Sequence, residues 1–232
     1  MGLQDLIKKA MISSIRSNNN EFNEEVIEYS KYRNIGMYLN DDILECLHDT
    51  QKPINDFKLL KIMKDNEIYL HREDEQDLCY DFILYEKTLN KKSGLDIYLE
   101  NNDIEDEEEL KLINAMKNAK TALYKAIGID KEGSSVLLEN VDTGERVGII
   151  DIGLSKSIQE ECLIFTRLIR LENISFTSGM SMVFDVDHED FLKRVLKKEI
   201  RKSNLDSDIQ RFISYFYLSR KHGYSIYRMG IV

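Results

Sequence analysis

The sequence lacks most features of membrane proteins, of secreted proteins and of small domains held together by a structural metal. No stretch approaches roughly 18 consecutive apolar residues, and the N-terminus has no apolar segment typical of a secretory signal. The three cysteines, Cys46, Cys79 and Cys162, lie far apart without a Cys-x-x-Cys pair, which argues against a disulfide framework or a structural zinc site. We therefore expect a cytoplasmic protein that does not enter a membrane and needs no cofactor.

Local catalytic motifs are missing as well. Aspartic proteases need two Asp-Thr-Gly triplets because two carboxylates share a proton, and this chain has one, at Asp142. No Gly-x-Ser-x-Gly turn presents a serine nucleophile, and the four histidines are scattered. The sequence favours a non-catalytic protein-binding or scaffold protein. The alternative is a hydrolase or nucleic-acid-processing enzyme whose site is assembled across domains.

The chain does have enough apolar residues for a core, and its charge is uneven. It has 232 residues, of which 42% are hydrophobic and 32% charged, with a net charge of −10. From Phe191 onward there are ten Lys and Arg against three Asp and Glu, so the acidic excess lies entirely in the first 190 residues. Such asymmetry is typical of a basic arm that binds nucleic acid, or of a basic end that docks on an acidic body.

Helical periodicity dominates the first part of the chain. Residues 3–15 have a clear apolar stripe, formed by Leu3, Leu6, Ile7, Ala10, Met11 and Ile15. Further helices are expected over 21–32, from Asn40 to about Thr50, over 55–65 and 73–90, and after the acidic stretch 100–109. The only proline, Pro53, is expected to mark the end of the helix before it.

After about residue 120 the pattern of apolar residues changes from helical spacing to short apolar runs separated by turn residues, which is typical of strands. Strands are predicted over 135–141, 146–152, 162–171 and 174–178, whereas 121–130 fits either the end of a helix or a first strand. Two helices follow, at 188–202 and from 203 or 206 to 221. We expect an α+β protein with a helical domain (1–120), an antiparallel β module (121–185) and C-terminal helices (186–232) that pack on the rest. Closure into a barrel is one way to protect the strand edges.

Two short motifs within the β module suggest chemistry but are better explained as turns. Asp142-Thr143-Gly144 has polar flanks, and Asp and Gly suit the backbone angles of a tight hairpin. Gly153-Leu154-Ser155-Lys156-Ser157 has too few glycines for a phosphate loop and is followed by a predicted strand. We interpret the first as a hairpin turn and the second as a connecting turn.

The β module resembles one found in uncharacterised bacterial proteins, some of which carry a SEC-C zinc motif. The resemblance covers about 65 residues and rests on Leu123, Tyr124, Leu138, Asp142, Thr143, Gly144, Glu145, Leu154, Ser155, Ser157, Arg167, Ile169, Ser178 and Gly179. The cysteine cluster of the zinc motif is absent here, so no zinc site is implied. The resemblance implies that 121–130 is a strand, and it implies no activity.

Two clusters near the C-terminus are candidate binding sites. Asp185, Asp187 and His188 carry ligands suited to a divalent metal, although acidic residues also begin helices. The helix that follows is strongly basic, and its candidate partner-binding residues are Lys193, Arg194, Lys197, Lys198 and Arg201. A protein partner is favoured. Nucleic acid is the alternative, because aromatic residues at 212–217 could stack on bases beside these cations.

Overall fold

The computed structural model describes residues 24–65 and 67–224, so the amphipathic segment 3–15 lies outside the described residues. The helices are α2 (Glu24–Cys46), α3 (Lys52–Leu59), α4 (Glu75–Tyr85), α5 (Gly94–Asn101), α6 (Glu107–Asn118), α7 (Ile152–Ser157), α8 (Glu189–Lys202) and α9 (Ser207–His222), with a 3-10 turn η1 (Val186–His188). The strands are β1 (Met63–Lys64), β2 (Glu67–Ile68), β3 (Lys120–Asp130), β4 (Ser135–Asn140), β5 (Arg146–Ile150), β6 (Leu163–Arg170), β7 (Ser175–Phe184) and β8 (Gly223–Tyr224). This is the α+β class expected from the sequence.

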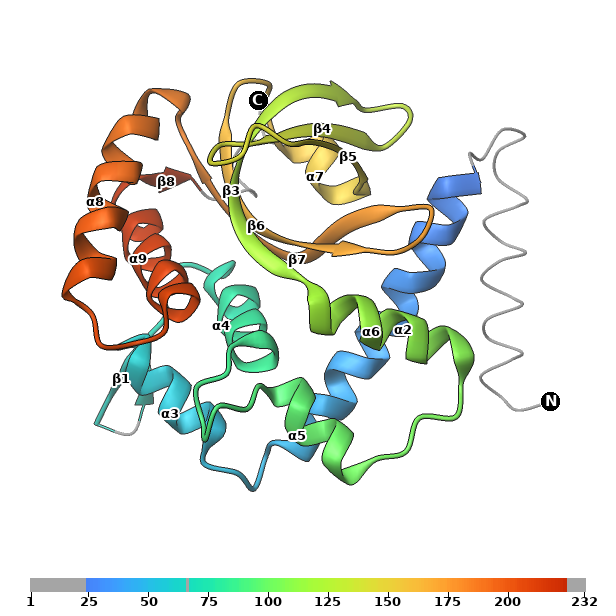
Figure 1. Cartoon of the computed structure of the whole chain (residues 1–232), viewed down its shortest axis with the longest axis vertical. Coiled ribbons are helices and arrows are strands. Elements are labelled where there is room, and N and C mark those ends of the chain that lie inside the picture. The colour runs from blue at the N-terminus through green and yellow to red at the C-terminus, as the bar shows by residue number, and fades with distance from the viewer. Residues whose placement is uncertain (1–23, 66, 225–232) are drawn as a thin grey trace.

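The centre of the molecule is an antiparallel sheet in the order β5-β4-β3-β6-β7-β8 (Figure 1). Within the described residues the sheet is open, because β5 and the short β8 form its two edges, so the alternative of a closed barrel is wrong. β1 and β2 form a separate two-stranded ribbon. The expected strand 174–178 continues to Phe184, because β7 pairs with β6 along most of its length.

Tertiary pairing decides the ambiguous segment 121–130. Lys120 to Lys125 pair with β6, and Tyr124 to Asp130 pair with β4, so both edges of β3 have strand partners. Its buried residues include Leu123, Tyr124 and Ala126. The segment is the strand that the resemblance implied.

Several helix boundaries differ from those expected. A break before Asn40 was wrong, since α2 runs without interruption and buries Leu39 and Ile43 on one stripe. Pro53 lies in the first turn of α3, where the missing amide hydrogen has no cost. Helix α4 ends at Tyr85 rather than near 90, and a separate helix, α5, begins at Gly94.

Of the two short motifs in the β module that were predicted to be turns, one is a turn and the other is a helix. Asp142-Thr143-Gly144 is the hairpin turn between β4 and β5, as predicted, with Gly144 at φ 73°. The segment around Gly153 is not a simple turn, because it forms α7. The Asp151 side chain accepts a hydrogen bond from the Leu154 amide and so caps this helix.

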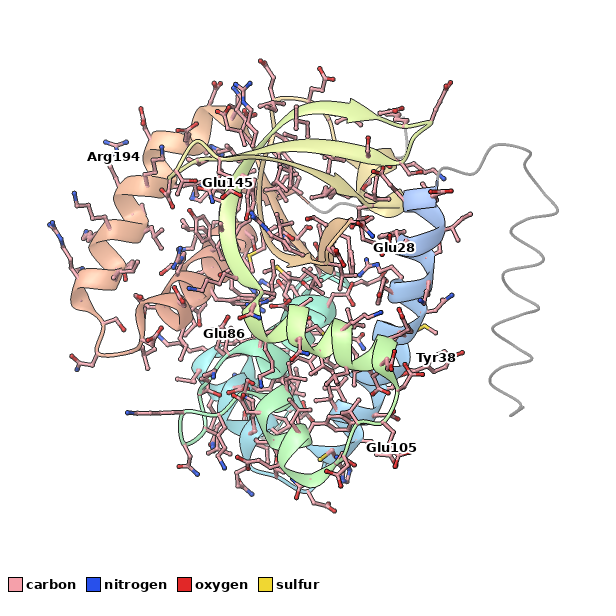
Figure 2. All side chains as sticks on the ribbon, turned by 45° about the vertical axis from the view of Figure 1, so that its right-hand side comes forward. Glu28, Tyr38, Glu86, Glu105, Glu145 and Arg194 are labelled. Carbon is pink, nitrogen blue, oxygen red and sulfur yellow. The ribbon has the colours of Figure 1, made fainter. Side chains whose placement is uncertain are left out.

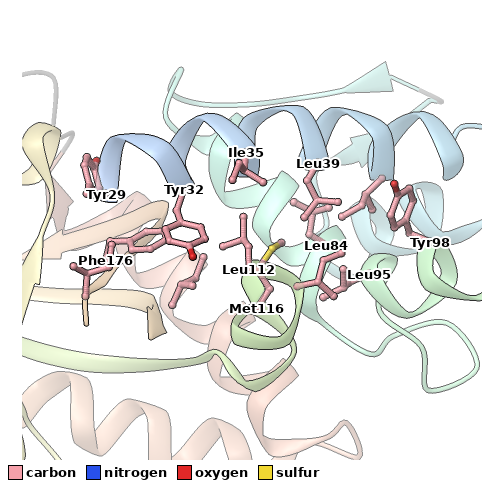
Figure 3. Packing of buried hydrophobic residues seen from close by; sticks show 14 of the residues in the cluster. Tyr29, Tyr32, Ile35, Leu39, Leu84, Leu95, Tyr98, Leu112, Met116 and Phe176 are labelled. Carbon is pink, nitrogen blue, oxygen red and sulfur yellow. The ribbon is translucent and has the colours of Figure 1, made fainter. Parts of the chain in front are cut away.

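The buried residues form three clusters that share the sheet. The first lies between α2 and helices α4, α5 and α6, and it reaches Phe176 of β7 (Figure 3). The second joins one part of the sheet to α4, α8 and α9, with Phe165 stacked on Tyr215 at 4.1 Å between ring centroids. The third lies under α7 and is built from β3, β4, β5, β6 and the end of β7. The C-terminal helices α8 and α9 match the two that were predicted.

Candidate interaction surfaces

A buried ionic centre joins α4 to the sheet. Arg167 of β6 is 4% exposed, and its Nη2 lies 3.0 Å from Asp81 Oδ1 and 2.6 Å from Glu86 Oε1. Its guanidinium lies over the Tyr85 ring, 4.3 Å from the centroid, and Ser178 Oγ donates to Asp81. The two carboxylates raise the pKa of Arg167 against the opposing effect of burial. Every charge in this centre is paired and buried away from solvent, so we assign the centre a role in stability.

A second buried pair links α3 to the segment after α4. Lys52 and Asp56 are both 0% exposed, and their charged atoms lie 2.8 Å apart. The Lys52 ammonium also donates to the Glu86 carbonyl and to Thr88 Oγ1. Burial lowers the pKa of Lys52, although Asp56 opposes this shift. Neither ionic centre was predicted from the sequence. The signal for the first was Arg167, a charged residue in the middle of the apolar strand LIFTRLIR.

A third polar cluster lies beside the irregular pairing of β6 with β7, where the register shifts between Thr166 and Leu168. Arg33 of α2 donates to the Thr177 carbonyl at 3.2 Å and to Tyr29 Oη at 3.2 Å. Thr177 Oγ1 donates to Asp151 at 2.5 Å, and Gly179 has φ 108° beside the Arg33 guanidinium. Arg167, Ser178 and Gly179 of the SEC-C-like pattern thus have structural contacts. These contacts do not test the resemblance itself.

The two buried cysteines, Cys79 and Cys162, are poor nucleophiles. Burial raises the pKa of Cys79 to about 12 and that of Cys162 to about 11, so both are thiols at neutral pH. Asp142 is exposed and lines a cavity of about 490 Å³ together with Asp208, which pairs with Arg211. Asp208 is thus paired with a cation, and no hydrogen bond joins the carboxyl groups of Asp142 and Asp208 in the described part of the chain, unlike the two acids of a protease dyad, which share a proton.

The three candidate metal ligands lie around η1. Asp185 accepts a hydrogen bond from the Asp187 amide and another from Tyr224 Oη, and so it caps this turn. The His188 ring faces His222, with 5.7 Å between centroids. No group of three or more His, Cys, Asp or Glu side chains that could hold a metal forms within residues 24–65 and 67–224. A metal at Asp185, Asp187 and His188 stays an untested prediction.

Helix α8 presents a basic face to solvent. Its apolar stripe packs inward, with Leu192 0% exposed and Phe191, Val195 and Leu196 against the second cluster. Arg194, Lys197, Lys198 and Arg201 are exposed, and Figure 2 shows Arg194 at the periphery of the molecule. Lys193, one of the five predicted partner-binding residues, forms an ion pair with Glu189 of the same helix. Lys197, Lys198 and Arg201 form no ion pair with any residue that the structure describes.

Phe212, Tyr215 and Phe216 of α9 are buried and cannot stack on bases, whereas Tyr217 is partly buried. Phe212 and Phe216 are 0% exposed, Tyr215 is 2% exposed, and Tyr217 donates its hydroxyl to the Leu60 carbonyl. Arg220 of the same helix pairs with Glu75 of α4 at 2.8 Å. Part of the basic C-terminal region therefore docks on the acidic body, which was one of the two explanations of the charge asymmetry.

Helices α2 and α6 lie on the other side of the molecule from α8 (Figure 1). They border an open groove of about 1240 Å³. The turn between β6 and β7 closes one part of it with Leu171. The lining contains seven carboxylates and three cations. One of the carboxylates, Glu108, accepts hydrogen bonds from Lys111 Nζ at 2.8 Å, Lys31 Nζ at 2.5 Å and Tyr32 Oη at 2.7 Å. These three donors lower the pKa of Glu108 to about 2.

The family described as "Family of unknown function (DUF7986)" matches residues 23–228. The chain belongs to this family. No curated protein and no solved structure matches it. The DUF7986 region includes all elements from α2 to β8, and therefore both the α8 face and the walls of the groove. Within the described residues of the DUF7986 chain, no helix is long and apolar enough to cross a membrane.

Proposed function

We propose that this DUF7986 protein is a non-catalytic binding protein, and that the basic face of α8 recognises an acidic segment of a protein partner. The observation that carries the proposal is the row Lys197, Lys198 and Arg201, which is exposed and has no carboxylate partner among the described residues. Arg194 extends the same face. Unpaired cations on a helix surface attract acidic partners and speed their association.

The packing of α8 favours a protein over a membrane. Membrane-surface helices insert an apolar face between lipids, and the apolar stripe of α8 is already covered by the body of the protein, with Leu192 fully buried. Only the charged side of the helix is left for a partner. A patch of this kind suits a short acidic peptide segment.

Nucleic acid is the second candidate, and two observations count against it. Three of the α9 rings that would stack on bases, Phe212, Tyr215 and Phe216, are buried in the second cluster, and Tyr217 packs against it. The net charge of −10 also repels a long polyanion until it reaches the patch. An enzymatic role has less support, because the buried charges are paired and the buried thiols are protonated.

A matched pair of charge reversals tests the proposal. The first variant combines Lys197→Glu, Lys198→Glu and Arg201→Glu. The control combines Lys64→Glu, Lys117→Glu and Lys131→Glu, which are exposed on three other elements and change the net charge equally. Fluorescence anisotropy with a glutamate-rich peptide of about twelve residues should show at least tenfold weaker binding for the first variant only.

The same binding assay also tests nucleic acid as the alternative ligand. Short single-stranded and double-stranded DNA and RNA are titrated at low salt, where phosphate contacts are strongest. Equal loss in both reversal variants would mean that binding depends on overall charge and not on α8. Tighter binding of nucleic acid than of the acidic peptide would overturn the proposal in favour of the second candidate.

A further inference from the structure

The groove side of α2 has the spacing of a helix-packing surface. The lining residues Glu24, Glu28, Lys31, Ile35, Tyr38 and Asp42 recur at intervals of four and three. This is the pattern through which two helices pack side by side. Tyr38 is 51% exposed although it is large and aromatic, and Figure 2 shows it on α2 together with Glu28. The surface is therefore suited to a further helix.

The opposite wall leaves room for that helix. The C-terminal part of α6 lines the groove with the small or short side chains of Asn114, Ala115 and Asn118, whereas its N-terminal part contributes the longer Glu108, Glu109 and Lys111. Short side chains allow a helix backbone to approach closely. Leu171 adds an apolar contact at the turn between β6 and β7. The groove thus has an apolar floor between two helices.

The rim of the groove is acidic. Glu24, Glu28 and Asp42 of α2 form no ion pair with other described residues. Lys31 and Lys111, two of the three cations in the lining, are both bound to Glu108. A helix that fits this site should therefore have an apolar stripe and a net positive charge.

The sequence of this chain contains such a segment directly before α2. Residues 3–16 carry the apolar stripe described above, with the cations Lys8, Lys9 and Arg16 against the single acid Asp5. Long lysine and arginine side chains can reach a charged rim while the helix body contacts apolar surface. The segment has both properties that the groove requires.

Its length and position also fit. At about 1.5 Å per residue, a helix over 3–16 is roughly 20 Å long, and the α2 side of the groove from Glu24 to Asp42 is roughly 27 Å long. Seven residues, 17–23, connect the segment to α2, including Asn18, Asn19 and Asn20. This is longer than the loop of about two to five residues that reverses an antiparallel helix pair.

We propose that residues 3–16 dock as an amphipathic helix in the groove between α2 and α6 of the same chain, antiparallel to α2. The tether raises the effective concentration of the segment to about the millimolar range, so even weak contacts keep the groove covered. The α8 helix of a second copy is a poorer occupant, because its apolar stripe is already packed. This inference does not depend on the partner proposed for α8.

Thiol accessibility in the full chain tests the docking. Asn114→Cys places a reporter on the exposed α6 wall, and Glu132→Cys places a reference thiol in the turn after β3. Maleimide labelling of each site is followed by peptide-resolved mass spectrometry, which separates these thiols from the native cysteines. The reporter should label at least tenfold more slowly than after Ile7→Asp, which puts a charge into the apolar stripe.

The matched control is Ile12→Asp. Residue 12 lies about 140° around a helix from residue 7, so it is on the opposite face, and its change should leave the protection of the reporter intact. Glu132→Cys should label equally in all backgrounds. High salt should raise the labelling rate of the reporter only, because it screens attraction to the acidic rim.

Two results would overturn the inference. One is equal labelling of the reporter in the unchanged, Ile7→Asp and Ile12→Asp chains. The other is protection that increases with protein concentration, which would show that a second copy supplies the segment. The α8 charge reversals should not alter the labelling rate, so failure here is distinguishable from failure of the proposed function.

Discussion

At the scale of single residues, Glu108 shows how one carboxylate can organise a surface between two helices. Its oxygens accept hydrogen bonds from Lys111 on its own helix and from Lys31 and Tyr32 on α2. The pKa of Glu108 falls from 4.5 to about 2 because these donors favour the charged form. A lowered folded-state pKa adds stability above the unfolded pKa and loses it as the pH falls toward 2.

We expect Glu108→Gln to lower the free energy of unfolding by about 1 kcal/mol at pH 7, the upper range for a partly exposed ion pair. The difference from the unchanged protein should shrink as the pH falls from 4.5 toward 2, where Glu108 becomes protonated. Urea unfolding measured at several pH values checks this. Glu107→Gln, exposed in the same first turn of α6, is the control and should show little change. A pH-independent loss for Glu108→Gln would contradict the prediction.

At the scale of elements, the start of α5 is fixed by close packing as well as by its cap. Ser93 and Asp96 form a reciprocal capping box. A Cβ added at Gly94 would lie 2.8 Å from the Ile83 carbonyl oxygen and 2.8 Å from Leu47 Cδ1. The first of these atoms belongs to the backbone of α4 and cannot move alone. Glycine therefore sets how closely α5 approaches α4.

We expect Gly94→Ala to destabilise the protein by about 1–3 kcal/mol, the usual cost of overpacking. The matched control is Gly148→Ala in β5, where an added Cβ meets no atom within 4 Å. That control should be neutral or stabilising by about 0.5 kcal/mol, since alanine restricts the unfolded chain. Thermal unfolding of the two variants checks the difference. If both variants had the same melting temperature, the close approach would not matter.

At the scale of the whole molecule, buried ionic centres connect parts that are distant in sequence. Arg167 on β6 binds Asp81 and Glu86, more than 80 residues earlier in the chain. Lys52 on α3 likewise reaches Glu86 and Thr88. The helical part and the sheet thus share a polar interior in addition to their apolar clusters.

We expect Arg167→Met to cost about 3–5 kcal/mol of unfolding free energy, because it leaves two buried carboxylates without a counter-charge. Arg146→Met is the control, since Arg146 forms an exposed pair with Glu139 and should cost less than about 1 kcal/mol. Adding Asp81→Asn to Arg167→Met should restore part of the loss by removing one unpaired charge. Denaturant unfolding measures all three variants. Similar losses for Arg167→Met and Arg146→Met would show that burial of the centre is not decisive.

The sequence by itself determined the features that depend on local periodicity and turn chemistry. The helices α8 and α9, the hairpin turn at Asp142 and the α+β class all follow from spacing, capping and turn residues. Only the tertiary structure decided whether 121–130 is a strand, since β4 and β6 supply its hydrogen bonds. The pairing of Arg167 with Asp81 and the groove between α2 and α6 were likewise invisible in sequence. Both arise where distant segments meet, and the attraction between two side chains depends on their distance in space and on their burial.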